Sequence, residues 1–185
     1  MDWLNEPPRW RREGGVLHVA TGERTDFWRE THYGFIRDDG HLAFERRERD
    51  LTAEVAVSGG YAELYDQAGL MLRLDARTWI KAGVEFVGGR RLLSCVVTRD
   101  VSDWSILSAF EAPDPVRVRL TRQGSAIRVE WAPQGGAFEI MRLAYFPPSD
   151  PVLVGPMCCS PERAGFEARF EDFRAGPAIE AALHG

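Results

Sequence analysis

Lysine is almost absent from this chain. The 185 residues include 23 basic side chains, and all of them are arginine except Lys81. An ammonium is a compact point charge whose pKa responds to its surroundings, whereas a guanidinium is a wide planar fork. A position that keeps lysine against this bias is a candidate for a specific local role, although chance retention of one lysine explains the same observation.

Long apolar runs are also missing. The first residues, MDWLNEPPRWRREGG, carry acidic groups and prolines where a secretory signal needs an apolar core. No later segment approaches the roughly 20 consecutive apolar residues of a membrane-spanning helix. We therefore expect a cytoplasmic protein that does not contact membranes.

Cysteine is scarce as well, and the sequence has no excess of positive charge. Cys95, Cys158 and Cys159 are the three cysteines, and their spacing fits neither a disulfide framework nor a zinc site. We expect reduced thiols, no metal and no cofactor. Acidic residues outnumber basic ones by 28 to 23, for a net charge of -5. Because phosphate backbones are bound by concentrated basic faces, nucleic acid is not an expected partner.

Local catalytic motifs are absent too. The sequence contains no G-x-S-x-G elbow, phosphate loop, dinucleotide fingerprint or H-E-x-x-H pair. The closely spaced carboxylates that glucanases carry on one strand are also missing. Glu85 paired with Asp66 or with Asp103 from a separate strand stays an alternative acid/base arrangement. No catalytic residue is assigned.

Short stretches with period-two alternation of apolar residues fill the chain and are separated by turn sequences rich in glycine, proline and aspartate. About eleven strands are predicted: 16–20, 52–57, 69–74, 79–86, 92–99, 105–110, 116–122, 126–132, 137–146, 152–157 and 165–173. Only residues 177–183 read as helical. Many amphipathic antiparallel strands pack best as two facing sheets. We expect an all-β single domain over residues 1–185, a two-sheet antiparallel jelly-roll sandwich.

The predicted core consists of the inward-facing apolar positions of these strands. These are Val55, Val57, Leu70, Leu72, Leu74, Ile80, Ala82, Val84, Phe86, Val116, Val118, Leu120, Ile127, Val129, Trp131, Phe166, Ala168 and Phe170. On the strands at 69–74 and 79–86 the opposite face carries charged and aromatic residues instead. We interpret that second face as an open surface.

The hairpin formed by these two strands has two plausible registers. If Leu74 pairs with Ile80, Arg73 lies opposite Lys81, which is unfavourable unless an anion covers the two charges. In the other register, Arg73 faces Trp79 and Met71 faces Lys81, which gives a cation-aromatic contact. Gly83 lies on the same face, where its missing side chain leaves room for a ligand to approach the backbone.

Candidate ligand-binding residues come from this face and from three neighbouring segments with polar aromatic or carboxylate side chains. The full set is Trp28, His32, Tyr33, Tyr65, Asp66, Gln67, Arg73, Trp79, Lys81, Glu85 and Trp104. The structural alternatives are an ordinary hydrogen-bonded histidine at 32, a turn cap at Asp66, a core position for Trp104, and a solvated ion-pair network on the sheet face.

Several longer motifs resemble one family. They are TDFWRETHYGF (25–35), YDQAGLMLRLD (65–75), WIKAGVEF (79–86), SCVVTR (94–99), SDWS (102–105) and VGPMCCSP (154–161). In order and wording they resemble an uncharacterised family of concanavalin A-like β-sandwich proteins, one of whose names refers to regulation of enolase. The resemblance implies a lectin/glucanase-type jelly roll with a concave sheet. It also implies kinship with sandwich domains appended to some family-forty-three-type glycosidases.

The functional expectation is binding of a saccharide or a small polar metabolite on the concave face. One alternative is a sugar-acting hydrolase or related enzyme that uses Glu85 with Lys81 or His32 in the same cleft. The other is a regulatory interaction domain in carbohydrate metabolism, with a metabolic enzyme or a second copy of the chain as partner. Fold analogy supports these functions without establishing them.

Overall fold

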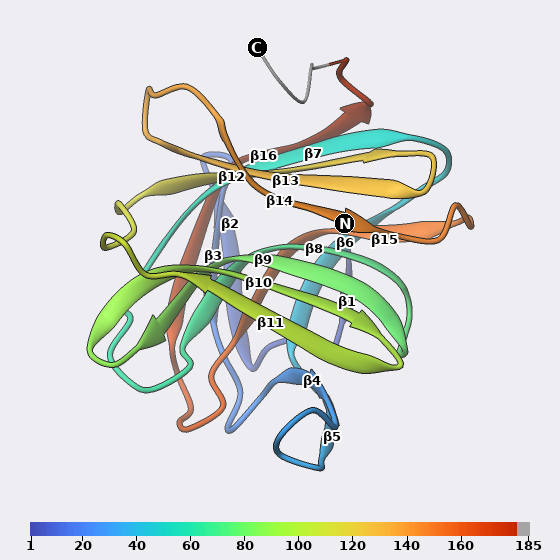
Figure 1. Ribbon diagram of the computed structural model, residues 1–185. Helices are drawn as coiled ribbons and strands as arrows, with labels where there is room; N and C mark the ends of the chain where they lie inside the picture. Colours follow the sequence, from blue (N-terminus) through green and yellow to red (C-terminus); the bar gives the residue numbers. More distant parts are fainter. Residues whose placement is uncertain (181–185) are drawn as a thin grey trace.

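The computed structural model describes residues 1–180, and these residues form β-strands and no helix (Figure 1). The first of two seven-stranded sheets has the order β1 (Asp2–Leu4), β6 (His41–Arg47), β15 (Val152–Cys159), β8 (Gln67–Asp75), β9 (Thr78–Val87), β10 (Arg90–Arg99), β11 (Val101–Leu107). The second has the order β14 (Glu139–Tyr145), β13 (Ala126–Pro133), β12 (Val116–Gln123), β7 (Leu51–Gly59), β16 (Glu167–Pro177), β3 (Val16–Ala20), β2 (Arg9–Glu13). A separate hairpin pairs β4 (Phe27–Arg29) with β5 (Ile36–Asp38).

The main core lies between the two sheets. Nearly every predicted inward position belongs to it, with Leu70, Leu72 and Ile80 completely shielded from solvent. Leu74 packs against this core from its edge. Phe86 is the exception, because it is half-buried near the end of β9 and lies outside the core cluster. Period-two alternation therefore identified the faces of these strands correctly.

Each predicted strand has a counterpart in the structure, and the predicted range 16–20 coincides with β3. The largest boundary errors are at β11, which begins at Val101 rather than Ser105, and at β16, which ends at Pro177 rather than Phe173. The short strands β1, β4 and β5 and the strands β2 and β6 were not predicted. Strand β2 reads RWRRE and is exposed throughout, so it carries no apolar alternation.

The β8–β9 hairpin adopts the second of the two predicted registers. Arg73 pairs with Trp79 and Met71 pairs with Lys81, and a bulge follows Arg73. Arg73 and Lys81 are therefore not opposite each other. This register avoids the like-charge pair that the first alternative required.

The outer face of the first sheet is not an open surface. Figure 1 shows the β4–β5 hairpin below β9 to β11, on the side away from β7 and β12. A second apolar cluster forms where this hairpin and its neighbours cover the sheet. Its members are Phe27, Trp28, Leu42, Phe44, Met71, Trp79, Val96, Met157 and Cys159. The expectation of a solvated face is wrong here, because a segment distant in sequence packs on it.

The predicted helix at the C-terminal end is not found where the structure describes the chain. Pro177 is the last residue of β16, and residues 178–180 have no regular structure. Residues 181–183 of that prediction lie outside the described residues. Within residues 1–180, no helix is long and apolar enough to cross a membrane.

Candidate functional site

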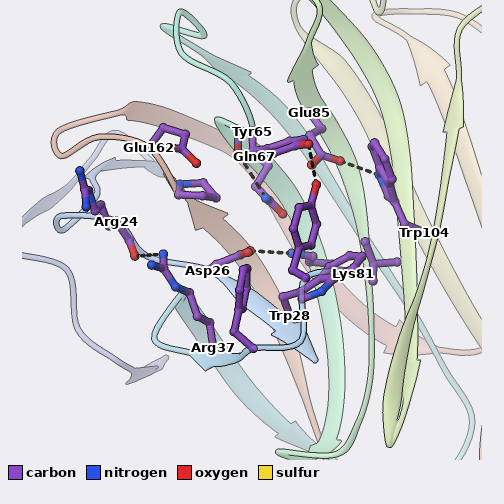
Figure 2. A pocket seen from close by; sticks show the side chains of 14 residues that line it. Arg24, Asp26, Trp28, Arg37, Tyr65, Gln67, Lys81, Glu85, Trp104 and Glu162 are labelled. Carbon is purple, nitrogen blue, oxygen red and sulfur yellow. Dashed lines mark hydrogen bonds and ion pairs between the residues drawn. The ribbon is translucent and has the colours of Figure 1, made fainter. Parts of the chain in front are cut away.

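A pocket with a cavity volume of about 320 Å³ lies between the β4–β5 hairpin and the outer face of the first sheet (Figure 2). We call it the hairpin pocket. Its lining combines aromatic rings with both signs of charge: Arg24, Asp26, Trp28, Tyr33, Phe35, Arg37, Tyr65, Gln67, Lys81, Glu85, Val96, Trp104, Pro161 and Glu162. This volume is at the lower end of the range of small-molecule sites.

Lys81 lies at the floor of the hairpin pocket and is almost fully buried. Its Nζ donates to the backbone carbonyl of Phe27 at 2.7 Å and to Asp26 Oδ1 at 3.2 Å. Burial lowers the pKa of Lys81, but the negative charges around it, chiefly Asp26, raise the pKa above its ordinary value overall. The side chain is thus held as an ammonium that anchors the β4 segment to β9.

Asp26 is positioned for this contact by its own backbone. Its carbonyl accepts from the backbone amides of Asp39 and Gly40, and its amide donates to Asp39 Oδ1 at 2.8 Å. Oδ1 also accepts from the amide of Phe27 at 2.7 Å. This leaves Asp26 Oδ2 with no hydrogen bond to any residue in the described part of the chain.

Glu85 is the second buried carboxylate of the pocket. Its Oε2 accepts from Ser94 Oγ at 2.6 Å and from the indole Nε1 of Trp104 at 2.9 Å. Burial raises the pKa of Glu85 above its ordinary value, although Lys81 and these two donors oppose the shift. The indole is thereby fixed against β9 with its ring in the pocket wall, where it is 37% exposed.

Aromatic rings form the mouth of the pocket. The hydroxyls of Tyr33 and Tyr65 lie 2.8 Å apart and join the hairpin loop to the segment before β8. The ring of Tyr33 stacks on Phe35 at 5.4 Å and meets Trp28 edge-on at 5.7 Å. The hydrogen bond to Tyr33 is the largest of the causes that raise the pKa of Tyr65 to about 12. Rigid aromatic walls of this kind suit the apolar faces of a flat ligand.

Most of the predicted site residues meet in this pocket. Trp28, Tyr33, Tyr65, Gln67, Lys81, Glu85 and Trp104 line it. Trp104 therefore faces the cleft and not the sandwich core.

Two predicted residues lie on the expected face of the first sheet, but the β4–β5 hairpin covers them. Trp79 is completely buried beside Phe27, with the two ring centroids 6.1 Å apart. Arg73 is 5% exposed and makes a bidentate pair with Asp38 of β5, at 2.6 and 2.7 Å. Their placement on an open surface was wrong, because β4 and β5 pack over them. Both side chains hold the hairpin in place and neither lines the pocket.

The remaining two candidates, Asp66 and His32, do not line the hairpin pocket. Asp66 is fully buried and accepts from the amides of Ala62 and Glu63 at 3.0 Å each, with Arg163 as its ion-pair partner. Asp66 therefore caps a turn, which was the alternative to a role in ligand binding. His32 is exposed in the hairpin loop, outside the pocket lining, with its ring 4.8 Å from that of Tyr33. The proposed pairs of Glu85 with Asp66 or Asp103 do not form within this lining either.

Gly83 has a different role from the predicted one. It pairs with Gly69 of the neighbouring strand, and a Cβ on Gly83 would lie 2.1 Å from the carbonyl oxygen of Ala68. The backbone of β8 occupies the space that we had assigned to a ligand. The glycine thus permits close approach of two strands.

Sequence reasoning missed the lining residues Arg24, Asp26, Phe35, Arg37, Val96, Pro161 and Glu162 as ligand contacts. Most of them lie inside or next to the motifs 25–35 and 154–161, so the density of these motifs was the available signal. In residues 1–180, no group of three or more His, Cys, Asp or Glu is placed to hold a metal ion. The three cysteines are buried and unpaired.

Three solved structures illustrate what this chain is similar to. A functionally unknown protein from Saccharomyces cerevisiae has a TM-score of 0.92 at 40% identity, with 97% of each chain covered. A GH43 protein from Bacillus licheniformis has a TM-score of 0.75 at 14% identity, and the match covers 96% of this chain and 37% of that one. The carbohydrate-binding module CBM66 from Bacillus subtilis has a TM-score of 0.57 at 11% identity, with 94% of each chain covered. The last two show the fold alone, a jelly-roll β-sandwich of the concanavalin A-like kind.

Sequence comparison identifies the family. Regulation of enolase protein 1 from Saccharomyces cerevisiae is 41% identical over 182 residues, which is 98% of this chain and 92% of the relative. Residues 3–178 match the family described as "Protein of unknown function (DUF1349)". This chain belongs to the DUF1349 family.

Proposed function

We propose that the hairpin pocket binds a saccharide or a small polar metabolite of similar size. The observation that carries this proposal is the composition of the lining. The pocket is lined by the aromatic rings of Trp28, Tyr33 and Trp104 and by the charged groups of Lys81 and Glu85. Sugars present apolar ring faces and peripheral hydroxyls, and such a lining offers partners for both.

Several polar atoms of the pocket are free to bind. Asp26 Oδ2, Glu85 Oε1 and Gln67 Oε1 have no hydrogen-bond partner among residues 1–180. Lys81 Nζ has two acceptors and therefore one further proton to donate. Hydroxyl groups both donate and accept, so they match this set. The fold shared with CBM66 supports the same ligand class by analogy alone.

The test is a binding screen with neutral and charged pentoses, hexoses and their derivatives, followed by thermal unfolding and calorimetry. A ligand at about 100-fold over its Kd stabilises the folded state by about 2.7 kcal/mol. Glu85→Gln should weaken the binding, whereas Glu139→Gln on the exposed edge strand β14 should leave it unchanged. Equal affinity in the wild type and Glu85→Gln would place the ligand elsewhere.

A regulatory role is the second candidate function, and one observation favours it. The yeast relative at 41% identity is named for regulation of enolase. Under this hypothesis a metabolic enzyme is the partner, and the pocket ligand would report metabolite levels to that partner. Co-purification of a stable complex with a metabolic enzyme supports this role, while turnover of a sugar in the pocket would favour the enzymatic alternative. A cytoplasmic location stays a prediction that agrees with three unpaired thiols.

A further inference from the structure

The two sides of the hairpin pocket differ in charge. Figure 2 shows Arg24 and Arg37 together on one side, and Glu85 and Trp104 on the other. Arg24 is exposed and Arg37 is half-buried, so the side with the arginines is the solvent-exposed rim of the cavity. Glu85, on the other side, is buried, and we call the part of the pocket around Glu85, Asp26 and Gln67 the buried side.

Arg37 is held in place at this rim. Its Nη1 donates to the carbonyl oxygen of Arg24 at 2.7 Å, and its guanidinium carbon lies 5.5 Å from the centre of the Phe35 ring. These contacts use one of the five N–H donors of the side chain. Among residues 1–180, neither Arg24 nor Arg37 has a carboxylate within ion-pair distance. Arginines elsewhere on this protein pair repeatedly, as Arg117 does with Glu54 and Arg163 with Asp66.

The buried side has a different character, because most of its free polar positions are acceptors and its one free donor is the remaining proton of Lys81 Nζ. Asp26 Oδ2, Glu85 Oε1 and Gln67 Oε1 all lack a partner in the described chain. An anionic group placed there would face two carboxylates, and the one cation beside them, Lys81, is already paired with Asp26. A ligand that enters hydroxyl-first can donate to all three atoms.

We propose that the ligand is an anionic polyhydroxy compound whose carboxylate or phosphate is bound by Arg37 at the rim, with Arg24 adding positive charge, while its hydroxyls occupy the buried side. This inference rests on the proposed function and specifies its ligand class. Guanidinium groups bind carboxylate and phosphate through paired N–H donors, which makes Arg37 the orientation-determining residue. Glu162 also lines the pocket, and its carboxylate opposes an anion that shifts toward it.

Calorimetry with three matched sets of probes tests the proposal: glucose and xylose, their aldonates, and their terminal phosphates. The anionic forms should bind about 10-fold or more tightly than the neutral sugars, and added salt should reduce this difference. Arg37→Gln should remove the preference and leave the affinity for the neutral sugar nearly unchanged. Glu162→Gln should increase the affinity for the anionic probes.

Arg46→Gln is the matched control. Arg46 is exposed and lies over the ring of Phe44 at 5.9 Å, much as Arg37 lies over Phe35, but it does not line the pocket. Its substitution should leave every affinity unchanged. A preference for aldonates over phosphates, or the reverse, identifies which anion the site accepts.

Each other result contradicts a specific statement. If glucose or xylose binds as tightly as its anionic forms, and Glu85→Gln weakens that binding, the pocket binds sugars but the anion proposal is wrong. If Arg37→Gln and Arg46→Gln have equal effects, Arg37 does not bind the anion. If no neutral or anionic probe binds, both the proposed function and this inference fail.

Discussion

The ammonium of Lys81 and the carboxylate of Asp26 form an ion pair at 3.2 Å that is almost entirely removed from solvent, with side chains 4% and 11% exposed. It connects the chain before β4 to the middle of β9, across 55 positions of sequence. A charge in such a place is costly without its partner. This ion pair is a structural reason for lysine at position 81, and it requires no ligand.

This relationship predicts the effect of Lys81→Met. The substitution leaves Asp26 buried without its cation, so it should destabilise the fold by about 3 to 5 kcal/mol. The double variant Lys81→Met/Asp26→Asn should recover a large part of that loss, because no isolated charge then remains. Urea unfolding of the wild type, the two single variants Lys81→Met and Asp26→Asn, and the double variant checks this. Strictly additive losses would show that the two side chains are not coupled.

Arg73→Ala should destabilise the protein to an extent that approaches a core substitution. The change removes the bidentate pair with Asp38 and the packing over Phe27, where the guanidinium lies 5.7 Å from the ring centre. We expect a loss of about 1 to 3 kcal/mol, against about 2 to 4 kcal/mol for Leu72→Ala in the core. Arg77→Ala is the control.

The ion pair of Arg77 with Asp100, at 2.6 Å, is exposed to solvent. Arg77→Ala should therefore lower the free energy of unfolding by less than about 1 kcal/mol. Thermal unfolding of the three variants gives the comparison. An Arg73→Ala protein as stable as Arg77→Ala would mean that the β4–β5 hairpin does not cover the sheet in solution.

Alanine at Gly83 should disrupt the β8–β9 contact. A Cβ there would lie 2.1 Å from the carbonyl oxygen of Ala68, and a Cβ on Gly69 would lie 2.0 Å from that of Ala82. Neither backbone can move without breaking the ladder, so each substitution should cost about 1 to 3 kcal/mol or more. A Cβ on Gly60 would have no heavy atom within 4 Å, so Gly60→Ala should leave the stability nearly unchanged. Equal melting temperatures for the three variants would rule out this close approach.

His41 should make the stability depend on pH. Its Nε2 accepts from the amide of Gly22 at 2.9 Å, and its Nδ1 lies 2.6 Å from the carbonyl of Asn5, which requires a neutral ring. Burial lowers the pKa of His41 below 6.5 and outweighs the carbonyl of Asn5 and the charge of Asp39. The unfolded chain therefore takes up the proton first as the pH falls. The contribution of this residue is complete above pH 6.5 and is lost as the pH decreases toward the folded-state pKa.

Urea titrations of the wild type and His41→Gln at about pH 7.5 and 5.5 isolate this effect. The wild type should lose more stability than the variant between the two conditions. The comparison with the variant is needed because the raised pKa of Glu85 acts in the opposite sense, favouring the folded state as the pH decreases. A variant with the same pH dependence as the wild type would contradict the prediction.

Tyr33→Phe should lower the pKa of Tyr65 from about 12 toward its ordinary value of 10, since the hydrogen bond between the two hydroxyls is the largest cause of the shift. Tyrosinate absorbance of the Tyr33→Phe variant should then include the ionisation of Tyr65 between pH 10 and 12. Adding Tyr65→Phe to the Tyr33→Phe variant should remove that ionisation. Its persistence in the double variant would assign it to another tyrosine.

Period-two alternation predicted the sandwich well because it depends only on local backbone geometry. It placed Leu72 and Val84 in the core and Lys81 on the other face, as the structure confirms. Alternation cannot say whether a face is covered. The cover consists of β4 and β5, whose three residues each are too few for a period to be recognised. The burial of Trp79 and the partner of Arg73 follow from this cover and were not predictable locally.

Period-two alternation also located part of the hairpin pocket. Glu85 belongs to the long regular strand β9, so its orientation could be read from the sequence. Trp104 lies before the predicted start of its strand, so the sequence left both a cleft and a core position open for it. Arg37 and Asp26 join them only through the tertiary position of the hairpin. The loop that contains Tyr33 was recognised by its aromatic density, but the direction of each ring depends on backbone angles such as the positive φ of 65° at His32.

A single buried lysine has a practical consequence for chemistry on this protein. An amine-reactive reagent finds only one side-chain target in the sequence, and the folded structure shields it. Acylation of Lys81 therefore requires the β4 segment to detach from the first sheet. The rate of that modification, followed by mass spectrometry after arginine-directed digestion, measures how often this one region opens. A ligand that bridges the hairpin and the sheet should slow the reaction without changing the reactivity of the reagent.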